Sequence, residues 1–323
     1  MTARAWAELL RVSALFTVPG DALAGAAAVG RRPGRSTALA MGASLCLYEA
    51  GMALNDWADR DEDAVDRPQR PIPSGRITPR AALTAAGALT AAGLGLAARA
   101  GRPALAVATG LAATVWAYDL RLKHTAAGPA AMAAARGLDL LLGATATATG
   151  GTTAPAPGPP APHASGATAT ATGRPAPHAG GALAGAALLT AHTYAVTAVS
   201  RHETRGGSTA APLTALASVL ALGGAMAAER RTSRDGAPAA RAPGRLLRTA
   251  LAGAYLRTAA RPLAHAALNP SPPLTQRAVG GGIRAMIPLQ AALAARAGAT
   301  GTGLAVMGLV PLARALSRKV SPT

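Results

Sequence analysis

The sequence is divided by long runs of small and apolar residues that carry almost no charge. Ala, Gly, Leu, Val and Thr fill stretches of roughly 17–22 residues, about the length an α-helix needs to cross a bilayer core. The expected spans are 12–31, 36–55, 79–98, 102–119, 126–148, 181–199, 211–228, 279–297 and 301–317. We therefore predict an all-α, polytopic transmembrane helix bundle of about nine spans, forming a single domain over residues 1–323.

Two segments allow more than one interpretation. A late apolar stretch, 246–267, contains Arg248, Arg257 and Arg261, which are costly in lipid unless they face the bundle interior or a headgroup layer. The amino-terminal segment has the basic start and apolar run of a secretory signal. Asp21 interrupts that run and apolar blocks continue along the chain, which favours a first span over a cleaved signal.

Composition supports a membrane protein and argues against other classes. Mean hydropathy is only +0.25 because the spans are rich in Ala and Gly, whose small side chains let helices approach closely in lipid. The net charge is +18, but the basic residues are scattered between apolar blocks, which is typical of membrane loops rather than of nucleic-acid-binding faces. A soluble all-α isoprenoid synthase would need many charged outer faces, and only 14% of the residues are charged. Cys46 is the single cysteine, which excludes a disulfide framework.

A segment rich in Thr, Ala, Pro and Gly, at about 150–180, separates the fifth and sixth expected spans. The sequence GATATATG at 143–150 recurs at 166–173. This composition cannot bury enough apolar surface to order itself, so we predict a disordered insertion outside the membrane. Its histidines, His163 and His178, are interpreted as solvated loop residues rather than metal ligands.

Six of the fourteen acidic residues lie between positions 56 and 66, at the end of the second expected span. Asp56, Asp59 and Asp63 are spaced i, i+3, i+7, so on one helix they project from one face, with Asn55 beside them. Three carboxylates so close repel unless a cation neutralises them, and Mg²⁺ suits them because it bridges carboxylates to phosphates. These three residues are the predicted metal ligands. The alternative is a solvated acidic helix end paired with arginines.

Two motifs carry a resemblance to a known family. NDWADRDEDAVDRPQRPIPSGR, starting at Asn55, closely resembles the first Asp-rich motif and adjoining loop of UbiA-type intramembrane prenyltransferases. YDLRLK, starting at Tyr118, resembles the Tyr/Lys loop of the same family. The resemblance implies Mg²⁺-dependent transfer of a prenyl group from a polyprenyl diphosphate to an apolar, aromatic or otherwise ring-bearing acceptor in the membrane.

The resemblance also implies roles for individual residues. The catalytic aspartates would be Asp56, Asp59 and Asp63, which bind Mg²⁺ and the diphosphate together with Asn55. The implied phosphate contacts are Arg67, Arg70 and Lys123, and Tyr118 would border the prenyl or acceptor pocket.

The second Asp-rich motif of the family is expected after the sixth span, where this chain reads SRHETRGGS. Glu203 is the one acid there and is the candidate catalytic carboxylate, with His202 and Arg205 as candidate substrate contacts. This departure, together with VPGDALAG and RGLDLLLG elsewhere, resembles the EboC-like branch of the superfamily. It also keeps an alternative function open: a non-catalytic UbiA-like protein that binds a prenyl lipid or metabolite within an export or lipid-handling system.

Three acids, Asp21, Glu49 and Asp139, fall inside expected spans, where charge is costly and invites a functional interpretation. Asp139 has Arg136 one turn earlier. The two therefore form an internal pair or contribute to an acceptor pocket, and the sequence leaves both possibilities open.

Basic residues indicate the orientation of the bundle. With a cytoplasmic amino terminus, the loops after spans two, four and six share one side and are rich in Arg and Lys. We predict an integral protein of the plasma membrane with its Asp-rich motif on the cytoplasmic side. The expected partners are a polyprenyl diphosphate donor, an apolar acceptor and the lipid bilayer, with no nucleic acid.

Overall fold

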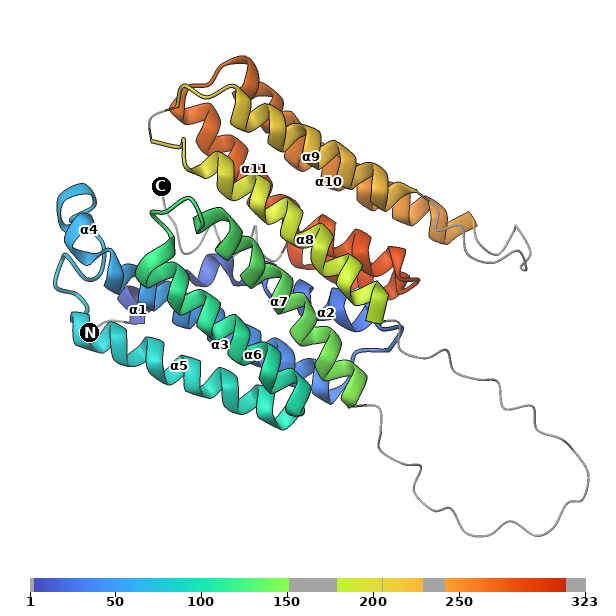
Figure 1. The fold of residues 1–323 in the computed structure, drawn as a ribbon, viewed down its shortest axis with the longest axis horizontal. Coiled ribbons are helices and arrows are strands. Elements are labelled where there is room, and N and C mark those ends of the chain that lie inside the picture. Colours follow the sequence, from blue (N-terminus) through green and yellow to red (C-terminus); the bar gives the residue numbers. More distant parts are fainter. Residues whose placement is uncertain (1–2, 151–178, 205, 229–241, 312–323) are drawn as a thin grey trace, which may run out of the picture.

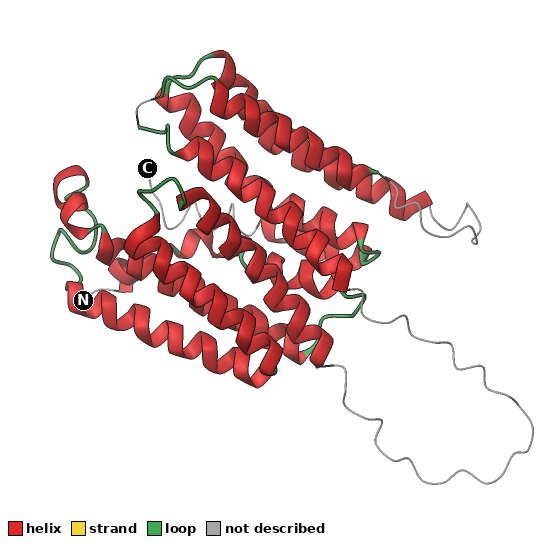
Figure 2. Ribbon diagram, in the orientation of Figure 1, coloured by secondary structure: helices red, strands yellow, loops and turns green. Residues whose placement is uncertain are grey.

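The computed structural model describes residues 3–150, 179–204, 206–228 and 242–311, and within these ranges all regular structure is helical (Figures 1 and 2). The long helices are α3 (Arg35–Ala58), α5 (Pro79–Ala100), α6 (Arg102–Ala117), α7 (Gly128–Thr149), α8 (Ala179–Ser200), α9 (Ala210–Ala227), α10 (Ala242–Leu268) and α11 (Pro272–Arg296). The short elements are α1 (Ala3–Leu9), η1 (Val12–Thr17), α2 (Pro19–Ala28), α4 (Arg60–Asp66), η2 (Tyr118–Leu122) and α12 (Thr300–Met307).

The helices follow the expected spans closely from α3 to α9, and the predicted all-α membrane fold is confirmed. Among the described residues, α3, α5, α8, α9 and α11 are long and apolar enough to cross a membrane, judged by length and composition. The ambiguous segment 246–267 lies within α10, a continuous helix of 27 residues. The insertion at 150–180 falls almost entirely outside the described residues.

The first and last expected spans differ from the prediction. The segment 12–31 divides into the 3₁₀ helix η1 and the ten-residue helix α2, which begins at Pro19. Proline has no backbone N–H and suits the first turn of a helix, so α2 starts there as a new helix. The last segment, 301–317, is described as far as residue 311, and the eight-residue α12 (Thr300–Met307) covers its start.

The bundle has two groups of helices joined by α7. In Figure 1, α3, α5, α6 and α7 run side by side in one group, and α8, α9, α10 and α11 form the other. The central helix α7 contacts α2, α6 and α8, so it connects both groups. The apolar core accordingly has one cluster centred on α8 to α11 and another on α3, α5, α6 and α7.

Small residues allow α2 and α7 to touch backbone to backbone. A Cβ added at Gly143 would lie 2.3 Å from the Cα of Ala22, and one added at Gly25 would lie 2.2 Å from the carbonyl oxygen of Leu140. Such close approach between apolar helices maximises dispersion contact where lipid supplies no hydrophobic drive to associate. The contact fixes the spacing between α2, which carries Asp21, and α7, which carries Asp139.

A buried histidine ties α8, α10 and α11 together. His192 Nε2 lies 3.0 Å from the carbonyl oxygen of Gly282, so this nitrogen carries the proton and donates. Its Nδ1 then accepts from the Tyr255 hydroxyl at 3.0 Å. Both ring nitrogens are satisfied, and His192 therefore holds three helices in register.

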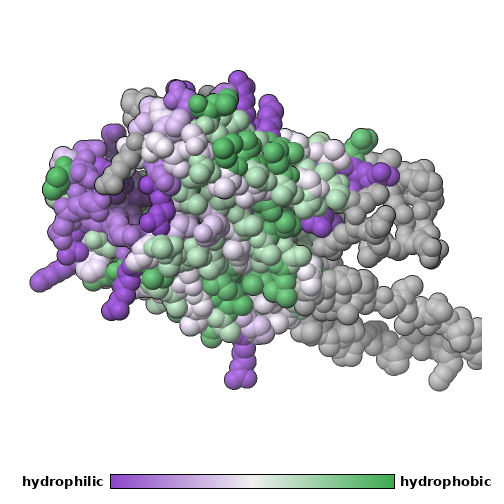
Figure 3. Space-filling view, turned by 45° about the horizontal axis from the view of Figure 1, so that its top comes forward, coloured by the Kyte–Doolittle hydropathy of each residue, from purple (hydrophilic) through white to green (hydrophobic). Residues whose placement is uncertain are grey.

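The surface separates into polar and apolar regions. In Figure 3, hydrophilic residues gather at the end of the molecule where α4 lies in Figure 1, and hydrophobic residues form a broad area across the middle. This distribution matches a bundle immersed in lipid with one polar end in water. The Asp-rich segment lies at that polar end.

The contact between α2 and α7 yields a testable prediction. Gly143→Ala should destabilise the protein by about 1–3 kcal/mol, because the new methyl group overlaps the α2 backbone. The control is Gly95→Ala on the exposed side of α5, where nothing lies within 4 Å of the added Cβ. That variant should gain up to about 1 kcal/mol from helix propensity. Unfolding midpoints in detergent measure both, and equal midpoints would contradict the close contact.

Candidate functional site

The Asp-rich segment lies on two helices rather than one. Helix α3 ends at Ala58, Asp59 has non-helical dihedrals (φ −88°, ψ 3°), and α4 begins at Arg60. The expectation of one continuous helix with three aspartates on a single face is therefore wrong at Asp59. As a result, Asp56 and Asp63 share one basic partner, whereas Asp59 pairs with residues of another loop.

Arg70 bridges the two buried aspartates. Its Nη1 lies 2.7 Å from Asp63 Oδ2 and 3.3 Å from Asp56 Oδ1. Arg67 adds a longer contact of 3.7 Å to Asp63 Oδ1. Both predicted phosphate contacts of this loop therefore lie within the acidic cluster. Arg76, farther along the same loop, is bound instead to Glu8 at 2.6 Å.

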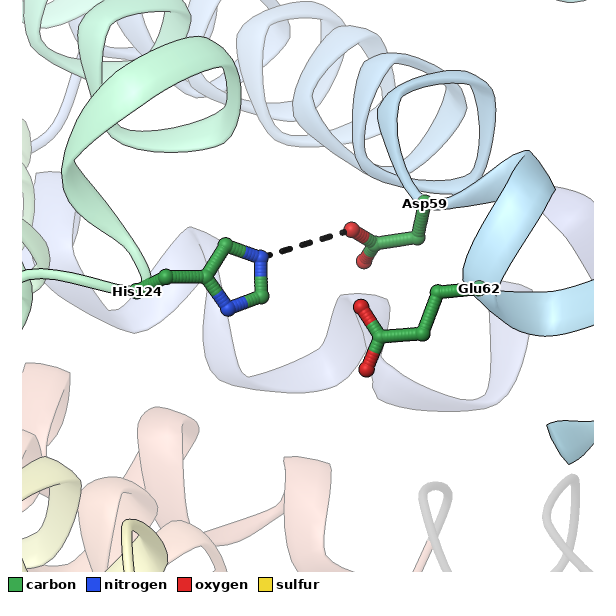
Figure 4. A group of neighbouring side chains, drawn as sticks. All are labelled: Asp59, Glu62 and His124. Carbon is green, nitrogen blue, oxygen red and sulfur yellow. Dashed lines mark ion pairs between the residues drawn. The ribbon is translucent and has the colours of Figure 1, made fainter.

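Asp59 faces the Tyr/Lys loop. It forms an ion pair with Lys123, and His124 Nε2 lies 3.9 Å from its Oδ1. Figure 4 shows the carboxylates of Asp59 and Glu62 and the ring of His124 facing one another, and their ligand atoms lie within 4.8 Å. The structure thus brings the predicted residues Asp59 and Lys123 together across 64 positions of sequence.

Arg11 belongs to this site although sequence reasoning did not select it. Its Nη2 lies 3.1 Å from Asp56 Oδ1 and 3.3 Å from Asn55 Oδ1. Its backbone is in the left-handed region at φ 49°, and among the described non-glycine residues it alone has a positive φ. Such conformations are costly for a side chain with a Cβ and concentrate at functional sites. The turn between α1 and η1 thereby aims Arg11 at the end of α3.

Asp119 is a second residue that sequence reasoning missed. Asn55 Nδ2 donates to its Oδ1 at 3.2 Å, which links the end of α3 to the YDLRLK loop. The loop starts as the π-helical turn η2, and such wider turns are frequent at functional sites. The one available signal was the position of Asp119 between the two motif residues Tyr118 and Lys123.

A cavity of about 450 Å³ opens beside this cluster, enclosed by α3, α6, α7, α8 and α11. Asn55, Arg11, Tyr118 and Asp119 line one end of it. Tyr118, predicted to border the prenyl or acceptor pocket, lies on the wall of this cavity, and its role stays a prediction. A large concave space adjoining convergent polar groups is the usual form of a small-molecule site.

The loop after α8 approaches the same end of the bundle. Arg201 Nη1 donates to the carbonyl oxygen of Thr125 at 2.8 Å, joining this loop to the one after η2. Burial raises the pKa of the Glu203 carboxyl above its usual value, and the positive charge of Arg67 partly opposes that rise. Glu203 is therefore close enough to Arg67 of the first motif for their charges to interact.

The remaining second-motif candidates are less directly placed. His202 has a buried Nδ1 that finds no hydrogen-bond partner among the described residues. Arg205 lies outside the described residues, so its predicted role stays a prediction.

The chemistry of the donor set fits Mg²⁺. Asp56, Asp59, Asp63 and Glu62 offer carboxylate oxygens, the ligands that Mg²⁺ prefers. One oxygen each of Asp56 and Asp59 receives no hydrogen bond or ion pair from the described part of the chain. Arg11, Arg70 and Lys123 surround these carboxylates, where they can contact an anion bound at the same place.

Comparison with known proteins places this architecture in a class. Residues 13–228, more than half of the chain, match the UbiA prenyltransferase family, and the chain therefore belongs to that family. A UbiA homologue from Archaeoglobus fulgidus, whose structure contains GPP and Mg²⁺, has a TM-score of 0.59 at 15% identity, covering 94% of this chain and 99% of that one. An apo UbiA homologue from Aeropyrum pernix K1 has a TM-score of 0.57 at 16% identity, covering 91% and 98%. At such identities the likeness establishes the fold.

Curated relatives share shorter stretches. The digeranylgeranylglyceryl phosphate synthase of Methanopyrus kandleri is 38% identical over 127 residues, which are 38% of this chain and 45% of the relative. The synthase of the same name from Methanothrix thermoacetophila is 59% identical over 44 residues, 14% and 16% of the two chains. The chain thus spans less than half the length of these relatives. They do not support the narrower resemblance to the EboC-like branch.

The Arg70 bridge gives a prediction that does not depend on activity. Arg70→Ala leaves two buried carboxylates without their shared cation and should destabilise the protein by roughly 1–3 kcal/mol. Millimolar Mg²⁺ should restore part of that loss, because a divalent ion replaces the missing charge. The matched control is Arg80→Ala, an exposed arginine at the start of α5. If thermal unfolding of the two variants shows equal midpoints with and without Mg²⁺, the bridge has no such role.

Proposed function

We propose that this protein transfers a prenyl group from a polyprenyl diphosphate, held with Mg²⁺ at the Asp-rich end, to an apolar acceptor in the adjoining cavity. The observation that carries the proposal is the position of Asn55. It is part of the acidic segment, contacts Arg11 and Asp119, and also lines the cavity wall. A headgroup bound at the acidic cluster would therefore have its hydrocarbon end at the cavity.

The charged residues have complementary roles in this proposal. Asp56, Asp59 and Asp63 are the proposed Mg²⁺ ligands, and the bound ion would supply a Lewis acid for the diphosphate oxygens. Arg11, Arg67, Arg70 and Lys123 provide positive charge at the same end. Because negative charge on the diphosphate grows as the bond breaks, these residues would stabilise the transition state more than the bound substrate.

The reaction would break the allylic C–O bond of the donor, with the electron pair leaving on the diphosphate. A new bond then forms between the allylic carbon and the acceptor, which loses a proton. Asp119 is the carboxylate that lines the cavity at this end and is placed to take it. The surface that the cavity exposes is largely apolar and would keep water from capturing the electron-deficient carbon.

We propose that the second motif has a smaller role in substrate binding than the first. Glu203 is half-buried and close enough to Arg67 for their charges to interact. We propose that Glu203 orients Arg67 toward the diphosphate. His202, on the same turn, is proposed to contact the substrate through its buried and unpaired Nδ1.

The acceptor and the orientation are also proposals. The names of the curated relatives refer to a glyceryl phosphate lipid. For this chain we propose an apolar, ring-bearing acceptor; the largely apolar surface that the cavity exposes supports the apolar character, and the ring is carried over from the resemblance of the two motifs. The loops after α3, η2 and α8 meet at one end, and their arginines favour the cytoplasmic side of the plasma membrane for that end.

One observation favours a second candidate function. The aspartates of the first motif are already paired with Arg11, Arg70 and Lys123, and the second motif contributes one carboxylate. A UbiA-like protein that binds a prenyl lipid or metabolite without turnover, as part of an export or lipid-handling system, would also suit this arrangement.

Substitution of Asp59 tests the metal role. Asp59→Asn should lower Mg²⁺-dependent pyrophosphate release from geranylgeranyl diphosphate roughly 100-fold, because one metal ligand loses its charge. Asp61→Asn, a neighbouring exposed aspartate, is the control and should retain normal release. Full turnover by folded Asp59→Asn protein would rule out the assigned role.

Metal removal distinguishes the proposed prenyltransferase from a protein that binds the prenyl lipid without turnover. Treatment with EDTA should reduce pyrophosphate release to background, and added Mg²⁺ should restore it, when the donor is supplied with a panel of phenolic and polyol acceptors. Binding of labelled geranylgeranyl diphosphate is measured in the same samples. Tight, Mg²⁺-dependent binding with no release for any acceptor would establish the binder instead.

A further inference from the structure

The cavity has a second polar end, deep in the bundle. Ser44 on α3 and Arg136 and Asp139 on α7 line it there, away from the Asp-rich cluster. Ser44 precedes Asn55 by 11 residues on one helix, which corresponds to about 16 Å along the axis. We name Ser44, Arg136 and Asp139 the inner polar subsite. Polar groups at such depth are costly and are generally retained for a purpose.

Residues behind the inner polar subsite fix the position of Arg136. Its Nη1 lies 2.7 Å from Asp21 Oδ2, and its Nη2 donates to Thr17 Oγ1 at 3.0 Å. Gln290 Nε2 donates to Asp21 Oδ1 at 2.6 Å, so both oxygens of Asp21 are engaged. The internal pair expected between Arg136 and Asp139 is thus weaker than the pair between Arg136 and Asp21.

Asp139 keeps hydrogen-bonding capacity that faces the cavity. Its Oδ1 accepts from the Ser44 hydroxyl. Its Oδ2 lies 3.9 Å from Arg136 Nη1, which is an ion-pair distance but beyond hydrogen-bond range, and the Asp139 carboxyl also contacts the carboxyl of Asp21. The side chain is about nine-tenths buried and lines the cavity, so a ligand there would meet an acceptor oxygen with room for another donor.

The charges of the subsite select the kind of ligand. One guanidinium faces two carboxylates, Asp21 and Asp139, and its stronger contacts are already made to Asp21 and Thr17. An anionic group placed here would meet Asp139 without a free cation to balance it. A neutral hydroxyl would instead donate a hydrogen bond to Asp139 and bring no charge of its own.

We propose that the inner polar subsite binds a neutral, hydroxyl-bearing end of the acceptor, on the order of 10 Å from the atom that is prenylated. This inference rests on the proposed function, because it assigns the prenylated atom to the Asn55 end of the cavity. It names the acceptor class: an elongated apolar molecule with a nucleophile at one end and a hydroxyl at the other. Asp21 and Gln290 act as positioning residues for Arg136.

A purely structural cluster predicts a different behaviour. If Ser44, Arg136 and Asp139 merely hold α2, α3 and α7 together, the chemistry at the far end of a ligand should not affect its affinity. The discriminating measurement is therefore the preference among ligands that differ at that end alone.

Three phenols provide that comparison: 4-(5-hydroxypentyl)phenol, 4-(5-methoxypentyl)phenol and 5-(4-hydroxyphenyl)pentanoic acid. Equilibrium binding of each to the full chain in detergent is measured without donor, so that the result does not depend on turnover. The hydroxyl compound should bind roughly tenfold more tightly than the ether, and the acid should bind no better than the ether. Equal affinities, or tighter binding of the acid, would overturn the proposal.

Two variants test whether the inner polar subsite causes the preference for the hydroxyl compound. Ser44→Ala and Asp139→Leu should reduce the preference for the hydroxyl compound to less than about threefold. The control Ser218→Ala removes a hydroxyl on α9 that bonds its own helix, and the preference should persist there. An unchanged preference in folded Asp139→Leu would contradict the assignment, and the wild-type ranking decides the matter if the variants fail to fold.

Turnover is measured separately with geranylgeranyl diphosphate and Mg²⁺. A hydroxyl preference without any pyrophosphate release would keep the inner polar subsite as a binding site and reject the proposed reaction. Pyrophosphate release with equal affinities for the three phenols would support the proposed reaction and reject the inner polar subsite as a binding site.

Discussion

The structure depends on neutralising carboxylates that are removed from water. Asp56 and Asp63 are buried at the polar end of the bundle, and Arg70 contacts both of them. Arg11 and Lys123 complete the charge balance from the amino-terminal turn and the Tyr/Lys loop. These three cations lie on three different segments of the chain. Their ion pairs tie those segments to the one that carries the aspartates, so four segments are held together. The same arrangement concentrates opposite charges at the mouth of a cavity, which is what binding a diphosphate headgroup requires.

Much of the fold could be predicted from the sequence because run length and composition dictate where a helix can lie in lipid. The expected spans from 36–55 to 211–228 agree with the helices to within a few residues. The prediction failed where local geometry decides. Helical spacing alone could not reveal the break at Asp59, which separates this aspartate from Asp56 and Asp63 and leaves it paired with Lys123, and the apolar pattern concealed the new start at Pro19.

The candidate site could be predicted in part. The acidic motif and the Tyr/Lys loop are local in sequence, and the structure brings them together. Arg11 and Asp119 could not be selected, because their significance comes from contacts with Asn55 across 44 and 64 positions. The same limitation affected Arg136, whose nearest acidic partner is Asp21 on another helix and not Asp139 one turn away.

The backbone contact between α2 and α7 has a mechanical consequence. Gly25 and Gly143 leave no compressible side chain between the two helices, so neither helix can slide or rotate far without a steric collision. The pair of helices is therefore stiff, it carries the buried ion pair between Asp21 and Arg136, and its α7 side lines the cavity. Any widening of the cavity that admits a bulky ligand has to come from the other helices around it.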